Sequence, residues 1–310
     1  MAQSREVMMG ILTIVVASVL WGTTGTVASF AENVSALATG AFAMGVGGIL
    51  LALSAGKALR KDRAKLWASP GALALGGLSV AAYPLAFYSA MQLAGVAIGT
   101  VISIASAPLF AVIMECLIGR KKPSAQWCLS FVFGMVGVLL LALGKQQEVM
   151  PSGGELARYA GMALGLLAGL TYATYSWVAR GMIARGVHSS SAMAGMFGVA
   201  ALVLLPSLAF TGSNLFATAT NTGVALYMAV VPMFLGYLCF SYGLRHVDVS
   251  QATLLTLLEP VVAMLLAVVV VGERFLLPGW FGMGLIIVSM LVQTGRGPFR
   301  LPGRRAVQPG

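Results

Sequence analysis

One acidic residue, Glu259, lies in the middle of a long apolar segment, directly before Pro260. If this segment crosses a bilayer, an ionisable group at that depth costs about 2.5 to 3.5 kcal/mol, which makes it a candidate functional residue. On a helical wheel it shares one face with Ala252, Thr256, Ala263 and Ala267. We therefore expect the carboxyl group to face protein or a cavity, where it pairs with a substrate ammonium or remains protonated. A structural carboxyl group bonded to a neighbouring helix fits equally well.

Aromatic side chains also lie deep in the apolar segments, where they can stack on a flat ring or face a cation. They are Trp21, Tyr83, Tyr88, Tyr172, Tyr175, Trp177, Tyr237 and Tyr242. We expect about half of them to line a substrate path, in layers above and below a central cavity, and the others to serve as packing. Ser103, Thr256 and Glu259 are expected to hold the polar end of a substrate.

The sequence offers few residues for disulfides, metal binding, ATP binding or catalysis. The three cysteines have no paired spacing, so neither a disulfide framework nor a zinc site is indicated, and two histidines leave a metal few ligands. No GxxxxGK[ST] loop is present to bind ATP, and no H-E-x-x-H pair or nucleophile elbow indicates an enzyme. We expect no cofactor and no metal.

The composition indicates an all-α integral membrane protein. Of the 310 residues, 59% are hydrophobic and 9% charged, and the mean hydropathy is +0.92. Soluble chains carry about 25% charged residues, so most of this chain must lie in lipid. The net charge of +10 does not indicate a nucleic-acid partner, because the basic residues sit between apolar runs and not along one face. Alternating strand patterns are absent, so helices must span the bilayer.

Ten apolar runs are long enough to cross ~30 Å of hydrocarbon. Their approximate limits are 8–29, 34–56, 70–93, 96–119, 124–144, 156–180, 188–211, 219–244, 249–271 and 276–295. The first run follows Arg5 like a signal peptide, but its length and the runs after it predict a retained transmembrane helix.

The basic residues predict the orientation. Sixteen of the nineteen Lys and Arg fall on one side if the N-terminus is cytoplasmic, and cytoplasmic loops hold such an excess. Both termini are therefore predicted to be cytoplasmic. Residues 297–310, with three prolines, are predicted to form a disordered cytoplasmic tail.

A shift of 152 residues aligns Thr100–Pro108 with Ala252–Pro260. It predicts two five-helix repeats, at 1–150 and 151–296. Because five is odd, the second repeat enters the membrane from the opposite side, and inverted repeats are typical of transporters with a substrate site near the bilayer midplane. An ancient duplication in a membrane enzyme or structural protein is the alternative.

Four prolines predict helix kinks, namely Pro84, Pro108, Pro232 and Pro260. Each leaves the carbonyl four residues earlier without its helical donor. For Pro108 and Pro260 these carbonyls belong to Ile104 and Thr256, which are repeat mates, meaning that they occupy corresponding positions in the two repeats. Two free carbonyls facing each other would accept hydrogen bonds from an amino group, although simple kinks are the competing interpretation.

No lysine or arginine falls in the middle of a predicted helix. Phosphorylated or dicarboxylic substrates require a fixed positive side chain near the bilayer midplane, so transport of such substrates is disfavoured. The expected partners are the lipid bilayer and a small zwitterionic or cationic solute, with no ATP and no required oligomer.

Three motifs carry a resemblance to a known family: Leu20-Trp21-Gly22, Leu258-Glu259-Pro260 and Gly272-Glu273-Arg274. With ten spans in two inverted halves, the chain resembles the EamA group of the drug/metabolite transporter superfamily across all ten predicted spans. Its aromatic-rich, lysine-free core is similar to bacterial exporters of the YddG type. That resemblance implies export of Phe, Tyr and Trp by alternating access across a bacterial inner membrane. A broad exporter of drugs or quaternary cations is the alternative, and a membrane enzyme or passive pore is disfavoured.

Overall fold

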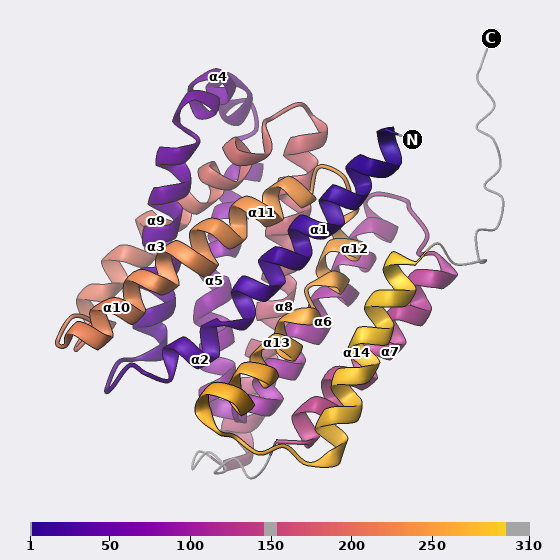
Figure 1. Ribbon diagram of the computed structural model, residues 1–310. Coiled ribbons are helices and arrows are strands. Elements are labelled where there is room, and N and C mark those ends of the chain that lie inside the picture. The colour runs from indigo at the N-terminus through magenta and orange to yellow at the C-terminus, as the bar shows by residue number, and fades with distance from the viewer. Residues whose placement is uncertain (1, 146–153, 296–310) are drawn as a thin grey trace.

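The computed structural model describes residues 2–145 and 154–295, and Figure 1 shows them as a bundle of helices. Ten helical segments in these ranges are long and apolar enough to cross a membrane, as predicted. These spans, numbered 1 to 10 in chain order, are Arg5–Ala28, Ala36–Ser54, Pro70–Ala94, Ile98–Leu117, Ala125–Leu143, Gly154–Ala184, Ser189–Thr211, Ala219–Gly243, Val249–Val271 and Leu277–Thr294. The predicted tail at 297–310 and the boundary between 150 and 151 lie outside the described residues.

The first half contains α1 (Ala2–Gly22), α2 (Thr24–Ala28), α3 (Ala36–Ser54), α4 (Gly56–Trp67), α5 (Pro70–Ala94), α6 (Val96–Leu117) and α7 (Ala125–Leu143). The second half contains α8 (Gly154–Ala184), α9 (Ser189–Thr211), α10 (Ala219–Met228), α11 (Gly236–Gly243), α12 (Val249–Leu255), α13 (Leu258–Leu266) and α14 (Leu277–Thr294). Two π-helical segments, η1 (Ala229–Leu235) and η2 (Ala267–Val271), lie within spans 8 and 9.

Local signals place several helix ends. Ser124 accepts a hydrogen bond from the Trp127 N–H at 3.0 Å and caps α7. Pro70 stands in the first turn of α5, where its missing N–H has no cost. Gly95, at φ 92°, reverses the chain between α5 and α6 in a conformation that other residues rarely adopt.

The prolines act differently in the two halves. Helices α5 and α6 continue through Pro84 and Pro108. Pro232 instead lies in η1, and Pro260 stands in the first turn of α13, after a break at residues 256–257. The Thr256 carbonyl accepts the Glu259 N–H at 3.0 Å, so the expectation of a free carbonyl there is wrong. A tight turn provides the donor that the proline lacks.

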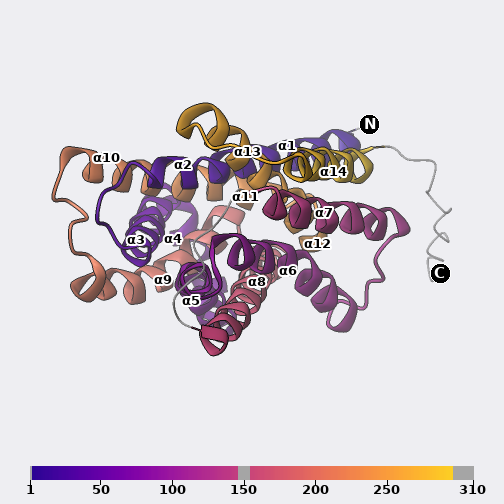
Figure 2. The ribbon, with the colours of Figure 1, turned by 90° about the horizontal axis from the view of Figure 1, so that it is seen from below.

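Helix pairing follows the internal repeat. Each of these contacts runs between the halves: that of α5 with α8 matches that of α11 with α1, and that of α6 with α8 matches that of α13 with α1. Helices α3 and α9, and α7 and α14, are mates that pack on each other. Figures 1 and 2 both show α7 beside α14 at the end of the bundle away from α10. The fold is thus two inverted five-helix repeats.

Small residues allow the closest approaches. Gly161, Gly165 and Gly169 of α8 follow one another at four-residue spacing. A Cβ on Gly161 would lie 2.6 Å from the backbone nitrogen of Ala94, and one on Gly169 would overlap the Ser106 hydroxyl. The glycine series therefore serves helix packing against α5 and α6.

Candidate functional site

Two adjoining cavities lie between the halves. The smaller, about 50 Å³, is surrounded by rings and is called the aromatic pocket. The larger, about 410 Å³, is called the vestibule, and most of its lining is aliphatic. Both are lined by Trp21, Thr24, Phe87, Tyr88 and Glu259. Only the vestibule has the size typical of a small-molecule site.

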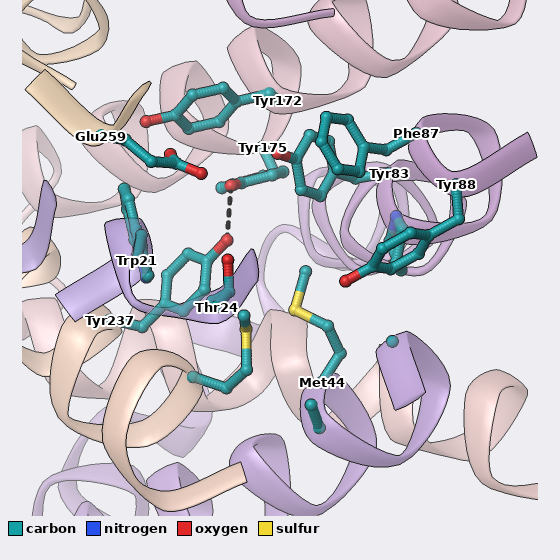
Figure 3. Close-up of a pocket in the computed structure, with 14 residues that line it drawn as sticks. Trp21, Thr24, Met44, Tyr83, Phe87, Tyr88, Tyr172, Tyr175, Tyr237 and Glu259 are labelled. Atoms are coloured by element: carbon teal, nitrogen blue, oxygen red, sulfur yellow. Dashed lines mark hydrogen bonds between the residues drawn. The ribbon is translucent and has the colours of Figure 1, made fainter. Parts of the chain in front are cut away.

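Glu259 lies where the two cavities meet. The break before α13 places it in the first turn of that helix, where the helix dipole favours negative charge. None of the ion pairs between described residues includes it. In Figure 3 its carboxyl group points among the rings, toward Tyr172 and Tyr175. The carboxylate is therefore available to an incoming ligand.

Tyrosine hydroxyls form two hydrogen-bonded pairs on the walls of the aromatic pocket. Tyr172 donates to the Thr256 Oγ1 atom at 3.1 Å, and Thr256 in turn donates to the Thr253 carbonyl at 2.8 Å. The hydroxyls of Tyr175 and Tyr237 lie 2.8 Å apart, as the dashed line in Figure 3 marks. These bonds satisfy buried hydroxyls and fix the rings around Glu259.

Trp21 is fixed by the π-helical segment of the other half. Its Nε1 atom donates to the Pro232 carbonyl at 2.9 Å. A Cβ on Gly236 would lie 2.7 Å from that nitrogen, so the indole needs the glycine. The disturbed hydrogen-bond pattern at Pro232 thus positions a ring of the pocket.

The rings form one cluster and not two layers. The centroid of Trp21 lies 6.4 Å from that of Tyr172 and 4.9 Å from that of Tyr237. Tyr83 is 5.7 Å from Tyr172, and Tyr175 is 1% exposed. The expected layers above and below a cavity are therefore wrong, because rings from both halves contact one another in a single cluster around the aromatic pocket.

Most of the predicted ligand-contacting residues line the aromatic pocket, but three do not. Those present are Trp21, Tyr83, Tyr88, Tyr172, Tyr175, Tyr237 and Glu259. Ser103 is 1% exposed and donates to the Gly99 carbonyl at 2.7 Å, within the packing of α6 on α8. Thr256 lies behind Tyr172, and Trp177 packs against the core outside the pocket. Of the four prolines, Pro84 lines the aromatic pocket and Pro260 the vestibule.

Sequence reasoning missed several lining residues. Thr24 and Phe87 line both cavities, and Met44 and Met233 line the aromatic pocket. Thr24 follows Trp21 by three residues and Phe87 follows Tyr83 by four, so helical spacing from the predicted rings would have found them. The aliphatic wall of the vestibule carries no such signal, because its residues match those that face lipid.

The vestibule opens at one end of the bundle. Its rim includes Val96, Lys145, Val271 and Glu273, which lie next to loops that follow odd-numbered spans. Lys145 and Glu273 approach to 3.9 Å across this rim. The rim belongs to the lower end of the bundle in Figure 1, away from the N-terminus.

The other end is closed by contacts between α6 and α12. The Glu115 carboxylate accepts the Ser250 N–H at 3.0 Å and the Ser250 hydroxyl at 2.6 Å. Lys121 and Asp248 form an ion pair at 2.7 Å, and the Trp127 indole donates to the Ser250 carbonyl at 3.0 Å. A carboxylate at a helix N-terminus forms strong charge-assisted bonds. The cavity is thus open to one side only.

Ten spans in inverted repeats, with a one-sided cavity at their junction, define a multi-pass membrane transporter. The sequence pattern of the EamA-like transporter family matches residues 8–143 and again residues 159–294. The chain belongs to this family, which is one of transporters and not of enzymes.

Named relatives agree with that assignment. The uncharacterized transporter YwfM of Bacillus subtilis strain 168 is 32% identical over 283 residues, covering 91% of this chain and 92% of that protein. The uncharacterized inner membrane transporter YedA of Escherichia coli K12 is 25% identical over 208 residues, covering 66% and 64%. One crystal structure matches with a TM-score of 0.75 at 20% identity, covering 92% of this chain and 96% of the other, which supports the fold alone. None of these names gives a substrate.

Proposed function

We propose that the chain is a secondary exporter of small solutes that carry a protonated amino group on an aromatic body, with Phe, Tyr and Trp as first candidates. One observation carries the proposal: Glu259 is the one residue with a formal charge among those lining the aromatic pocket, and rings surround it. A partly desolvated carboxylate without a protein cation favours an ammonium ligand, and neighbouring ring faces add cation–π attraction.

The cavity volumes suggest how such a solute is held. The aromatic pocket, about 50 Å³, has room for a small polar group but not for a ring. The vestibule beside it, about 410 Å³, has room for the ring. We therefore place the amino group at Glu259 and the aromatic body in the vestibule, against Phe87, Tyr88 and the aliphatic wall. Alternating access then requires the vestibule to close after the solute has left through it.

A second candidate substrate is an aromatic quaternary cation. An amino acid also brings a carboxylate, and Lys145 is the one basic residue among those lining the vestibule. It stands at the rim, 3.9 Å from Glu273, so it is already partly neutralised. A cation without a carboxylate would need no such partner.

The direction of transport rests on the proposed topology. We place both termini in the cytoplasm of a bacterium, because sixteen of nineteen basic residues then lie inside. In that orientation the vestibule opens outward and the Glu115 contacts close the cytoplasmic end. Export would then pass through the reverse state, open at the α12 end.

The test is a parallel transport assay in proteoliposomes. Labelled phenylalanine and a labelled aromatic quaternary cation are loaded, and exchange is followed while each of the twenty amino acids competes. Saturation, trans-stimulation and competition by aromatic amino acids are expected. Exchange of the quaternary cation alone would favour the second candidate, and non-saturable flux of both would indicate a pore.

A further inference from the structure

Helix α4 is the most strongly basic surface feature of the described chain outside the transport path. The sequence predicted only a connection between two spans here, but residues 56–67 form a twelve-residue helix. Its five basic residues are all exposed, namely Lys57, Arg60, Lys61, Arg63 and Lys65. Figure 1 shows α4 at the end of the bundle where the N-terminus lies, opposite the vestibule opening.

The other face of α4 is fixed to the protein. Leu66 is 6% exposed and belongs to the main hydrophobic core, and Asp62 is 3% exposed. The Asp62 carboxylate accepts the His188 N–H, just before α9, at 2.9 Å, and Lys65 lies 3.4 Å from it. Burial acts to raise the pKa of Asp62, but the hydrogen bonds to it outweigh that effect, so the pKa is lowered and the group stays charged at neutral pH.

These contacts leave four cations for an external partner. Lys65 is engaged by Asp62 and by the Gly186 carbonyl, at 2.6 Å from the latter. The ion pairs between described residues include none of Lys57, Arg60, Lys61 and Arg63, which we call the basic face of α4. Because Asp62 and Leu66 fix the opposite face of α4 to the protein, the helix cannot rotate to bring its basic face against protein carboxylates.

Apolar side chains at both ends of α4 place it at the lipid border. Leu53, three residues before its start, is 72% exposed, and Trp67, its last residue, is 68% exposed. Span 2 ends at Ser54, so Leu53 faces the edge of the hydrocarbon layer. Tryptophan favours the headgroup level, where one edge of the ring is wet. The basic face therefore lies at the depth of phospholipid headgroups.

We propose that α4 is an interfacial helix whose basic face binds anionic phospholipid headgroups, such as phosphatidylglycerol or cardiolipin, in the leaflet on that side. Each Lys or Arg near an anionic surface gains attraction that a zwitterionic headgroup does not give, and four of them act together. The bound lipids would hold the α3–α4 junction and the start of α9 in place. This site is independent of the transported solute.

The test compares lipid retention by the purified full-length protein using native mass spectrometry. One variant removes the basic face: Lys57→Gln, Arg60→Gln, Lys61→Gln and Arg63→Gln. A matched control removes the same charge from the C-terminal segment: Arg296→Gln, Arg300→Gln, Arg304→Gln and Arg305→Gln. Wild type and control should retain phosphatidylglycerol over phosphatidylcholine, and the α4 variant should lose that preference on the order of tenfold. Equal loss in both variants, or no loss in either, overturns the proposal.

A second measurement does not depend on the fourfold variant folding. Brominated phosphatidylglycerol in mixed vesicles should quench the Trp67 fluorescence, obtained by subtracting the signal of a Trp67→Phe variant, more than brominated phosphatidylcholine does. The difference should vanish in high salt because the attraction is screened. Equal quenching by the two lipids at low salt would mean that the basic residues serve membrane insertion only.

Discussion

Spans 4 and 9 occupy corresponding positions in the two repeats, but the contacts between them differ at the two ends of the bundle. At the α12 end, the Glu115 carboxylate of span 4 accepts the Ser250 N–H and hydroxyl of span 9 at 3.0 and 2.6 Å, and helices α6 and α12 are in contact. At the vestibule end, Val96, the first residue of α6, and Val271, the last residue of span 9, both line the cavity. An inverted repeat would exchange these ends, so the difference marks one of two alternative states and shows which contacts must break to reach the other.

The pairing chemistry at the two ends is also unequal. The closed end has short charge-assisted bonds to a helix N-terminus, whereas the one ion pair found among the described residues at the open end spans 3.9 Å. Residue Ala267, which corresponds to Glu115 at a shift of 152, has only a methyl side chain and cannot make the matching bond. The α12 end therefore has a stabilising contact that the corresponding residues cannot form at the vestibule end.

Removing the Glu115 contact should have the largest effect on this balance. Glu115→Ala leaves the first turn of α12 without its acceptor, a loss of about 1 to 3 kcal/mol, so the opposite state gains population about 5- to 150-fold. The measurement is labelling of Ala252→Cys, a buried site on α12, by a membrane-impermeant thiol reagent in a background without the native cysteines. Labelling should rise.

The matched control removes an acid at the open end. Glu273→Ala breaks only an exposed pair, worth about 0 to 1 kcal/mol, so labelling at position 252 should stay near the wild-type level. If Glu115→Ala and Glu273→Ala change labelling equally, the two ends are not energetically different.

Trp21 tests whether the pocket wall is tied to the opposite half. Trp21→Phe keeps a ring but removes the bond to the Pro232 carbonyl, a loss of about 0.5 to 1.5 kcal/mol. We expect KM for aromatic solutes to rise more than KM for small aliphatic ones, measured by exchange in proteoliposomes. An equal rise for both kinds of solute would mean that the indole serves stability and not recognition.

The smallest expected difference separates the ion pairs of the two ends. Lys121→Gln and Lys145→Gln each remove an exposed pair, so each should change stability by less than about 1 kcal/mol. Only Lys121→Gln should slightly raise labelling at position 252, because its partner Asp248 precedes α12. A larger effect of Lys145→Gln would place the gate at the open end.

Much of the fold was predictable because hydropathy is a local signal. The ten spans, their inverted halves and the depth of Glu259 follow from apolar length and the position of Pro260. Helix α4 was missed because its apolar face is only two or three residues wide and its charges resemble those of a loop.

The site was predictable in part, for a different physical reason. The deep rings and Glu259 stand out as residues that lipid disfavours, and they do meet. Their arrangement in one cluster depends on how the halves cross, which no local pattern reports. Ser103 was expected to contact substrate, but small hydroxyl side chains occur both in polar sites and at helix–helix contacts, and the sequence does not distinguish the two roles. In the structure Ser103 lies at a helix–helix contact and donates to the Gly99 carbonyl.

The most direct test of the central claim concerns the carboxyl group of Glu259. Exchange of an aromatic ammonium solute is measured across pH for wild type, Glu259→Gln and the vestibule control Glu273→Gln. We predict that Glu259→Gln loses about 2 to 5 kcal/mol of ion pairing with the substrate, which lowers the transport rate roughly thirtyfold or more. The same variant should lose the pH dependence of transport. Glu273→Gln should keep the wild-type rate and the wild-type pH dependence. Unchanged rates and pH profile in Glu259→Gln would contradict the account.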